Sequence, residues 1–341
     1  MDQTLLPTAT LFNHNNSLTA VAGISVGHYT DDRRPTGCTV VLCPQGAVAG
    51  VDVRGAAPGT RDTDALAPSN TIQQAHGILL TGGSAYGLDA AGGVMRWLEE
   101  QAHGLEVGTA IVPIVPAAAI FDLWVDDVPA QRVRPNADAG YQACIAANTD
   151  PVEQGNIGAG TGATLGKLNG ANCAMKGGVG SASLTVNGVT VAALVVCNAL
   201  GDIFDPQTGK LLAGARVTEH SRELLDICQF QLNGHSIKKP QVGGNTTIGV
   251  VATDAVLTKP QAHRLAQVAH NGLARSIRPV HTPMDGDTLF ALGTGTSDQS
   301  ADMMLLSTLA AEVTAMAVVN AVKSAQDIQL ASGWWPAMTT R

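Results

Sequence analysis

The sequence predicts an α+β fold in which two stacked sheets are covered by helices. Three observations lead to this class. Strand patterns and helical patterns both occur along the whole chain, and one pair of strands forms a clear hairpin. The two kinds of element do not alternate in the regular β-α-β order of a doubly wound sheet. The chain has 341 residues without a low-complexity linker, so we expect a single domain over residues 1–341.

The N-terminal part of the chain contains short predicted strands. Three of them are GISVGHY (23–29), CTVVLC (38–43) and AVAGVDVR (47–54), each bounded by glycine, proline or charge. Residues 76–100 then predict a strand, a glycine turn and a helix. The Gly82-Gly83 turn and Ser84 resemble an anion-binding loop, because a helix N-terminus offers free amides, but GxGxxG and the Walker lysine are absent. Close strand-to-helix packing is the preferred interpretation, and binding of a carboxylate or oxyanion is the alternative.

The C-terminal half begins with the clearest local prediction, a hairpin at 181–198. Asn187-Gly188 lies between two β-branched runs, which is typical of a type I′ turn. A strand at 246–254 follows, and Thr258-Lys-Pro-Gln261 then predicts a capped helix start. This helix carries Leu265, Val268, Leu273 and Ile277 on one face. A strand at 287–295 precedes a long apolar helix from about 301 to 323.

The composition narrows the partners and the location. Hydrophobic residues make up 45% and charged residues 14%, so much of the surface is uncharged or covered by neighbouring subunits, and we expect a homo-oligomer such as a tetramer. The formal net charge of −8 and the absence of a Lys/Arg run argue against nucleic acid and anionic membranes as partners. No signal-like N-terminus and no uninterrupted apolar run of 18 residues are found, so we expect a cytoplasmic protein. Six cysteines without CxxC spacing are expected to be buried and reduced.

The segment GGNTTIGVVATDAV, residues 243–256, places two glycines, an asparagine and two threonines directly against a predicted core strand. One interpretation is a hairpin entry, in which Gly243 and Gly244 turn the chain and Asn245 tolerates positive φ. The other is scission between Asn245 and Thr246 by an N→O acyl shift and ester hydrolysis, which the glycines would allow. A threonine freed in this way carries its own general base, the α-amine, beside its hydroxyl. Scission would give the fragments 1–245 and 246–341.

A second polar cluster, HTPMDGDTLF at 281–290, contains Asp285 and Asp287. The two acids predict a divalent metal site, a solvated turn, or a pair that orients the hydroxyl and amine of a nucleophile. A calcium loop needs more oxygen ligands, so we expect neither a metal nor another cofactor. Five of the histidines show no HExxH motif or close metal-binding pair, and we interpret them as surface or structural residues: His28, His220, His263, His270 and His281. Ser84 lacks a GxSxG context, which argues against a Ser/His/Asp hydrolase.

Seven segments between about residues 18 and 325 together resemble one family. They are GISVGHY, PTGCTVVL, LLTGGSAYGLDAAGGV, GAGTGAT, LVVCN, GNTTIGVVATDA and MDGDTLFAL. The family is the L-aminopeptidase/D-Ala-esterase-amidase family, which includes β-peptidyl aminopeptidases and the 6-aminohexanoate-oligomer (nylon oligomer) endohydrolase. The resemblance implies the four-layer αββα sandwich of N-terminal-nucleophile hydrolases. It also implies autocatalytic cleavage just before a serine or threonine, and that position falls on Thr246.

The same resemblance assigns roles to further residues. Asn198 would donate its side-chain amide to the tetrahedral oxyanion, and such a donor contributes about 3 kcal/mol in other acyl-transfer enzymes. Lys167 matches a site lysine of the nylon-hydrolase branch. Asp285 and Asp287 match the acid pair of that branch, whereas the β-peptidyl branch has serine and glutamate there.

Substrate contacts are expected at Ser84, Tyr86 and Phe121. Phe121 is a departure from the family, because relatives carry an Ile-Tyr-Asp segment where this chain has Ile120-Phe121-Asp122. Phenylalanine keeps the ring but has no hydroxyl, so a hydrogen bond from that position to substrate or oxyanion is lost.

The predicted function is that of a self-processing N-terminal-threonine amidohydrolase or aminopeptidase. It would hydrolyse short peptides, amino-acid amides or ω-amino-acid oligomers through an acyl-enzyme. One alternative is an acyltransferase of the ornithine acetyltransferase type, which has a related fold and passes the acyl group to an amine. The other is an unprocessed, non-catalytic relative that acts as a binding or assembly protein.

Overall fold

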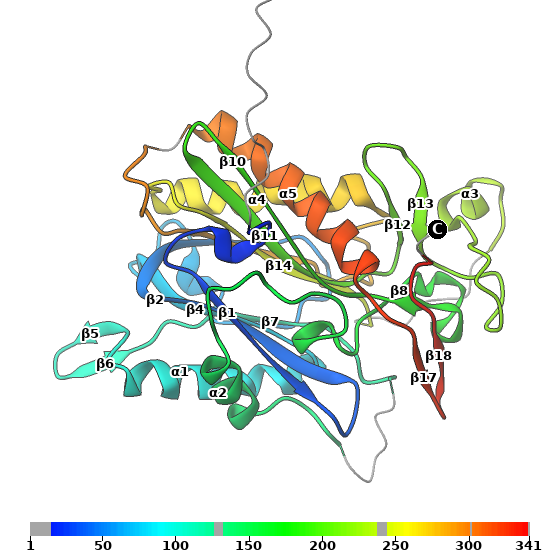
Figure 1. The fold of residues 1–341 in the computed structure, drawn as a ribbon, viewed down its shortest axis with the longest axis horizontal. Coiled ribbons are helices and arrows are strands. Elements are labelled where there is room, and N and C mark those ends of the chain that lie inside the picture. Colours follow the sequence, from blue (N-terminus) through cyan, green and yellow to red (C-terminus); the bar gives the residue numbers. More distant parts are fainter. Residues whose placement is uncertain (1–14, 126–131, 237–243, 301, 340–341) are drawn as a thin grey trace, which may run out of the picture.

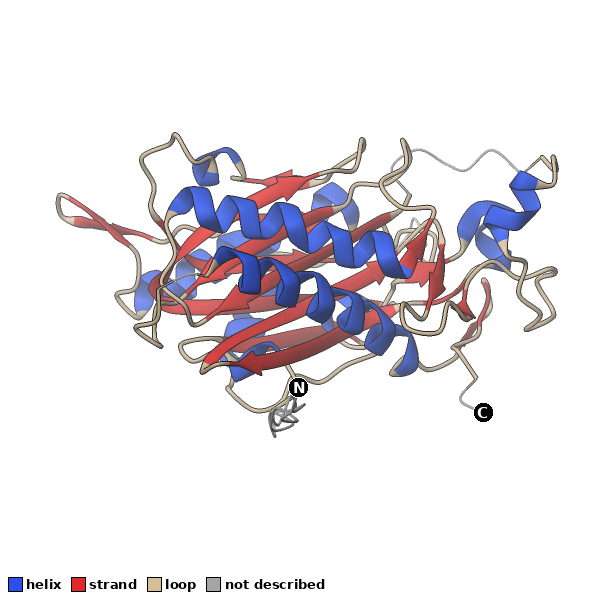
Figure 2. Cartoon of the chain, turned by 90° about the horizontal axis from the view of Figure 1, so that it is seen from above, coloured by secondary structure: helices blue, strands red, loops and turns tan. Residues whose placement is uncertain are grey.

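The computed structural model describes residues 15–125, 132–236, 244–300 and 302–339, and it has four layers (Figure 1). Helices α4 (Lys259–Ser276) and α5 (Met303–Lys323) pack side by side on one sheet. Helices α1 (Ala90–Glu100) and α2 (Ala137–Ile145) pack on the other. The view from above shows α4 and α5 lying across the strands beneath them, while the short helix α3 (Ile227–Leu232) lies to one side (Figure 2). The predicted αββα sandwich is confirmed.

The main strands form one hydrogen-bonded network that is folded into the two sheets. Its order is β10 (Gly178–Val186), β11 (Val189–Asn198), β14 (Thr246–Thr253), β16 (Thr288–Gly293), β2 (Thr36–Val53), β4 (Gln74–Thr81), β7 (Ala117–Ala119) and β3 (Thr60–Arg61). Strand β1 (Ser25–Asp31) pairs with residues 36–42 of β2, and residues 48–53 of β2 pair with β16. Strand β2 therefore connects the two sheets.

Four smaller groups of two or three strands lie outside this network in the part of the chain that the structure describes. They are β12 (Asp202–Phe204) with β13 (Leu211–Ala213) and β15 (Ile277–Arg278), β5 (Leu105–Val107) with β6 (Ala110–Val112), β8 (Thr164–Leu165) with β9 (Met175–Lys176), and β17 (Ile328–Leu330) with β18 (Gly333–Trp335). The β5–β6 hairpin projects from the body beside α1 (Figure 1).

Strand β2 corrects the prediction of two separate strands at 38–43 and 47–54. The structure has one strand of 18 residues there. Pro44 and Gly46 suggested a break, but Gly46 adopts a φ of +83°, and the register with β4 shifts between Leu42 and Ala47. An irregularity of this kind bends a strand without ending it. The bend carries β2 from one sheet into the other.

Three apolar layers lie between the four layers of secondary structure. Because successive side chains of a strand point to opposite faces, β14 buries Ile248 and Val250 between the sheets and Val251 against the helices. The third layer lies between β1, β2, β4 and the pair α1 and α2. Helix α5 is long and apolar enough to cross a membrane by length and composition, but 61% of that window is buried inside the protein, as in a core helix.

Other local predictions can be compared directly with the structure. The hairpin turn has positive φ at both Asn187 (53°) and Gly188 (78°), which confirms the type I′ turn. The capping box at Thr258 is present. Ile277 is buried but lies in β15, because α4 ends at Ser276, so its assignment to the helix was wrong. Four cysteines are buried as expected, while Cys173 and Cys228 are partly exposed.

Candidate active site at the start of strand β14

Thr246 is the first residue of β14, and it pairs directly with Asn198, the last residue of β11. Thr246 lies two residues before Ile248, and Asn198 lies two residues after Val196. Because side chains alternate between the faces of a strand, both point into the space between the sheets, as Ile248 and Val196 do. Both side chains are buried. The antiparallel register therefore places the predicted nucleophile and the predicted oxyanion donor on the same face of one sheet.

The peptide bond before Thr246 is held by two donors. The Thr246 hydroxyl donates a hydrogen bond to the Asn245 carbonyl oxygen. The backbone amide of Gly286 donates to the same oxygen at 3.0 Å. A donor on this carbonyl stabilises the negative charge that the oxygen would gain if its carbon were attacked. Gly244 is buried in this segment, whereas Gly243 lies outside the described residues.

The Asn198 side chain has a defined orientation. Its Oδ1 accepts hydrogen bonds from the Thr164 amide at 2.9 Å and from Lys167 Nζ at 3.0 Å. Because these donors fix the oxygen end, Nδ2 must point the other way, and it donates to the Phe121 carbonyl at 3.2 Å. The geometry thus presents an N–H donor in the neighbourhood of Thr246, as an oxyanion donor requires.

Lys167 connects Asn198 with the segment that precedes Thr246. Its ammonium donates to the Asn198 carbonyl oxygen at 2.8 Å and to the Gly244 carbonyl oxygen at 3.4 Å, and it lies 5.3 Å from the centre of the Trp124 ring. Burial lowers the pKa of Lys167 to about 7, although the charge of Asp285 acts in the opposite direction. An amine with this pKa can both accept and release a proton near neutrality.

The acid pair lies beside the nucleophile strand. Strand β16, which begins one residue after Asp287, pairs in parallel with β14. Asp287 Oδ1 accepts from the Thr247 amide at 2.6 Å, and Asp285 Oδ2 accepts from the Thr282 amide at 3.0 Å. Burial raises the pKa of Asp285 to about 6, and the charge of Asp287 adds to this effect. The two carboxylates therefore flank the start of β14 from the neighbouring strand.

His281 belongs to this cluster, although its spacing in the sequence predicted a surface or structural residue. Its Nδ1 lies 2.8 Å from Asp287 Oδ2, and its ring meets the ring of the buried His270 edge-on at 4.8 Å between centroids. The signal available in the sequence was its position in HTPMDGD, four residues before Asp285. A search for metal-binding spacing could not find a histidine that binds an acid.

The three predicted substrate residues lie on two adjacent segments. Phe121 contacts Asn198 through its backbone carbonyl, and its ring packs edge-on against Trp124 with 4.9 Å between centroids. The Ser84 amide donates to the Ile120 carbonyl at 2.9 Å. Tyr86 is exposed, with the Arg134 guanidinium 4.0 Å from its ring centre.

The segment that carries Phe121 is anchored by Asp122. This buried carboxylate forms an ion pair with Arg34 at 2.8 Å and accepts from the Gly83 amide at 2.9 Å. The amides of Gly83 and Ser84 are thus engaged by the protein itself. This favours the packing interpretation of the Gly82-Gly83 turn over anion binding.

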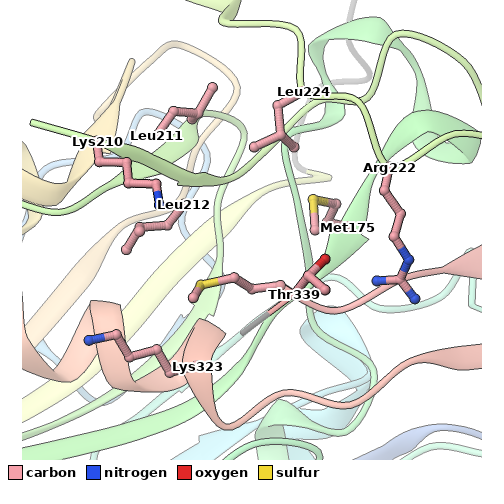
Figure 3. A pocket seen from close by; sticks show the side chains of 9 residues that line it. Met175, Lys210, Leu211, Leu212, Arg222, Leu224, Lys323 and Thr339 are labelled. Carbon is pink, nitrogen blue, oxygen red and sulfur yellow. The ribbon is translucent and has the colours of Figure 1, made fainter. Parts of the chain in front are cut away.

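Within the described ranges, no group of three or more His, Cys, Asp or Glu side chains is placed to hold a metal ion. A pocket of about 440 Å³ is lined by Met175, Leu224, Arg222 and Lys323 among others, and Figure 3 shows apolar and cationic side chains around it. None of the candidate active-site residues described in this subsection contributes to its lining.

Comparison with known proteins places this site in context. Residues 16–334 match the profile described as Peptidase family S58. An uncharacterised aminopeptidase of Mycobacterium tuberculosis is 48% identical over 295 residues, which is 82% of each chain. The 6-aminohexanoate-oligomer endohydrolase of Kocuria sp. is 32% identical over 314 residues, which is 88% of this chain and 84% of that protein. The L-aminopeptidase D-Ala-esterase/amidase of Ochrobactrum anthropi superposes with a TM-score of 0.72 at 22% identity, covering 98% of this chain and 94% of that one, and it is described as a variant of the Ntn hydrolase fold.

Proposed function

The chain belongs to peptidase family S58, whose members hydrolyse amide bonds, and we propose that its nucleophile is Thr246, freed by self-cleavage after Asn245. One observation supports this most directly. The buried Thr246 hydroxyl contacts the carbonyl oxygen of Asn245, and the Gly286 amide donates to that same oxygen. The bond to be cut thus already has its nucleophile beside it and a donor for its oxyanion.

Self-cleavage would proceed in two steps. Thr246 Oγ attacks the Asn245 carbonyl carbon, the C–N bond breaks, and the hydroxyl proton passes to the departing nitrogen. Water then hydrolyses the resulting ester, which leaves a carboxylate on Asn245 and a free hydroxyl and amine on Thr246. Lys167 is the candidate proton carrier, because it binds the Gly244 carbonyl at 3.4 Å and burial lowers its pKa to about 7.

Hydrolysis of substrate would reuse the same groups. The freed α-amine, with a reference pKa of about 7.7 to 8.0, accepts the proton of the Thr246 hydroxyl, which attacks the substrate carbonyl. Asn198 Nδ2, now bonded to the Phe121 carbonyl at 3.2 Å, donates to the tetrahedral oxyanion. The leaving amine takes the proton, and water releases the acyl group from Thr246.

The substrate we propose is a short peptide, an amino-acid amide or an ω-amino-acid oligomer. The name aminopeptidase in the mycobacterial relative and the name 6-aminohexanoate-oligomer endohydrolase in the Kocuria relative support this range. Aminoacyl p-nitroanilides and 6-aminohexanoate oligomers sample both ends of it. Turnover of either class by the cleaved chain supports the proposal, and transfer of the acyl group to added amines in preference to water would favour the acyltransferase alternative.

We further propose that the chain is a cytoplasmic homo-oligomer. The low share of charged residues supports covered surface. Sedimentation equilibrium of the purified protein measures the subunit number, and a monomer would remove this part of the proposal.

The role of Thr246 is tested by substitution. Thr246→Ala should remain a single chain and be inactive, because no other hydroxyl fills both roles. Thr246→Ser keeps a hydroxyl beside the α-amine and should still be cleaved. Cleavage of the Thr246→Ala chain at the same bond would exclude Thr246 as the nucleophile.

A further inference from the structure

We propose that His281 is a positioning residue of the hydrolysis, which acts by holding the Asp287 carboxylate in place beside the nucleophile. The inference rests on the proposed function, because it concerns the surroundings of Thr246. It adds a residue that the family resemblance does not assign and that sequence spacing does not reveal.

The contacts of Asp287 define this role. His281 approaches Asp287 Oδ2 twice, with its backbone amide at 3.1 Å and its Nδ1 at 2.8 Å. Oδ1 accepts from the Thr247 amide at 2.6 Å. With Nδ1 as the donor, this contact matches the acceptor character of a carboxylate oxygen. Both oxygens of Asp287 are therefore fixed, one by His281 and the other by the residue next to Thr246.

The backbone of His281 provides a second, independent observation. Its φ is +55°, in the left-handed region that non-glycine residues seldom adopt. This conformation lets the amide and the ring of one residue reach the same carboxylate oxygen. Backbone outliers of this kind are concentrated at functional sites, where the surrounding structure maintains them.

The groups around His281 restrict its ring and set its electrostatic surroundings. On α4, the ring of the buried His270 meets His281 at 4.8 Å, and His270 Nε2 donates to the Asp52 carbonyl at 3.0 Å. The Asp52 carboxylate lies 3.5 Å from that same Nε2. On the other side are the acid pair and the ammonium of Lys167, which interacts with both acids.

The hydrogen bonds from His281 orient Asp287 within the acid pair. Because both oxygens of Asp287 are hydrogen-bonded, the carboxylate is held in one orientation. Asp287 is thus held against the amide adjacent to Thr246. Burial and the charge of Asp287 raise the pKa of the neighbouring Asp285 to about 6.

Two substitutions of His281 separate the hydrogen bond from the ring itself. His281→Leu removes the donor, whereas His281→Asn places an amide N–H near the position of Nδ1. His263→Leu on α4 is the control, because the His263 ring binds a backbone carbonyl, that of Val51, where His281 binds a carboxylate. All are made in the full-length chain. Rates are expressed per cleaved chain, with the cleaved fraction taken from intact mass.

We expect His281→Leu to lower kcat by about 10-fold or more with KM within about 2-fold, because only orientation during the reaction is lost. We expect His281→Asn and His263→Leu to stay within about 3-fold of the wild type. If His281→Leu does not fold, His281→Gln replaces it, since its longer side chain does not place a donor at Nδ1.

Two outcomes overturn the inference. One is a normal kcat in His281→Leu, and the other is a loss in His281→Asn as large as in His281→Leu. Neither would affect the proposed function, provided that the wild type is cleaved and Thr246→Ala is inactive. Conversely, an uncleaved but active wild-type chain would remove the proposed function itself, whatever the His281 variants do.

Discussion

Replacement of Asn198 by alanine should separate catalysis from stability at this site. The side chain presents Nδ2 as a donor, because the Thr164 amide and Lys167 Nζ both occupy Oδ1. Asn198→Ala therefore removes the donor to the developing oxyanion, and it also removes the acceptor of two buried donors.

The two losses differ in size. Loss of one oxyanion donor costs about 10²–10³ in kcat, or about 2.7–4 kcal/mol of transition-state stabilisation. Loss of the Oδ1 acceptor leaves the Thr164 amide without its partner, at a cost of about 1–3 kcal/mol in stability. Lys167 keeps the carbonyl oxygens of residue 198 and of Gly244 at 2.8 and 3.4 Å. We thus expect a folded, less stable enzyme whose kcat falls at least 100-fold.

The assay measures kcat and KM per cleaved chain with an aminoacyl p-nitroanilide, and the urea midpoint of the same sample. Asn320→Ala is the matched control, because Asn320 Nδ2 also donates to a carbonyl, that of Ser181, at 2.9 Å. It should lose stability and retain its kcat. A kcat within about 3-fold of the wild type in cleaved Asn198→Ala would refute the oxyanion role, since loss of an oxyanion donor should lower kcat by about 100-fold or more.

Three further predictions concern charge and pH. Asp287→Asn should lower turnover by roughly 10² or more per cleaved chain, and near-normal turnover would reduce the acid pair to a structural turn. Chelators should leave activity unchanged, and a loss restored by a divalent ion would revive the metal interpretation. Burial lowers the pKa of His270 to about 4, so its contribution to stability is complete above the unfolded value of about 6.5 and is lost as pH falls toward 4. His270→Gln keeps a donor for the Asp52 carbonyl, so its urea midpoint should fall less between pH 7 and pH 5 than that of the wild type, and an equal fall would contradict the assignment.

Much of the local structure could be predicted from the sequence because its signals are local. The Asn187-Gly188 turn needs positive φ at two positions, and the capping box at Thr258 needs only residues one turn apart. The course of β2 was not predictable in this way. Its continuation through Gly46 depends on a register shift against β4, a partner about 30 residues away.

The functional site likewise combines residues that are visible in the sequence with contacts that only the fold creates. The residue types at Thr246 and the acid pair indicated catalytic roles among other interpretations, and the family resemblance decided between them. The contact between His281 and Asp287 depends on a left-handed backbone at His281 and on the ring of His270 from α4. Neither condition is visible in a spacing pattern. The orientation of the Asn198 amide likewise depends on donors that lie about 30 residues away along the chain.

The intact mass of the purified wild-type chain, together with its N-terminal sequence, tests the central claim most directly. The uncut chain has a mass of 34.9 kDa. We predict two species that correspond to residues 1–245 and 246–341, with threonine as the new N-terminus. A single species at the mass of the uncut chain, in a sample that hydrolyses amides at full rate, would contradict the account, because Thr246 would then have no free α-amine to act as its base.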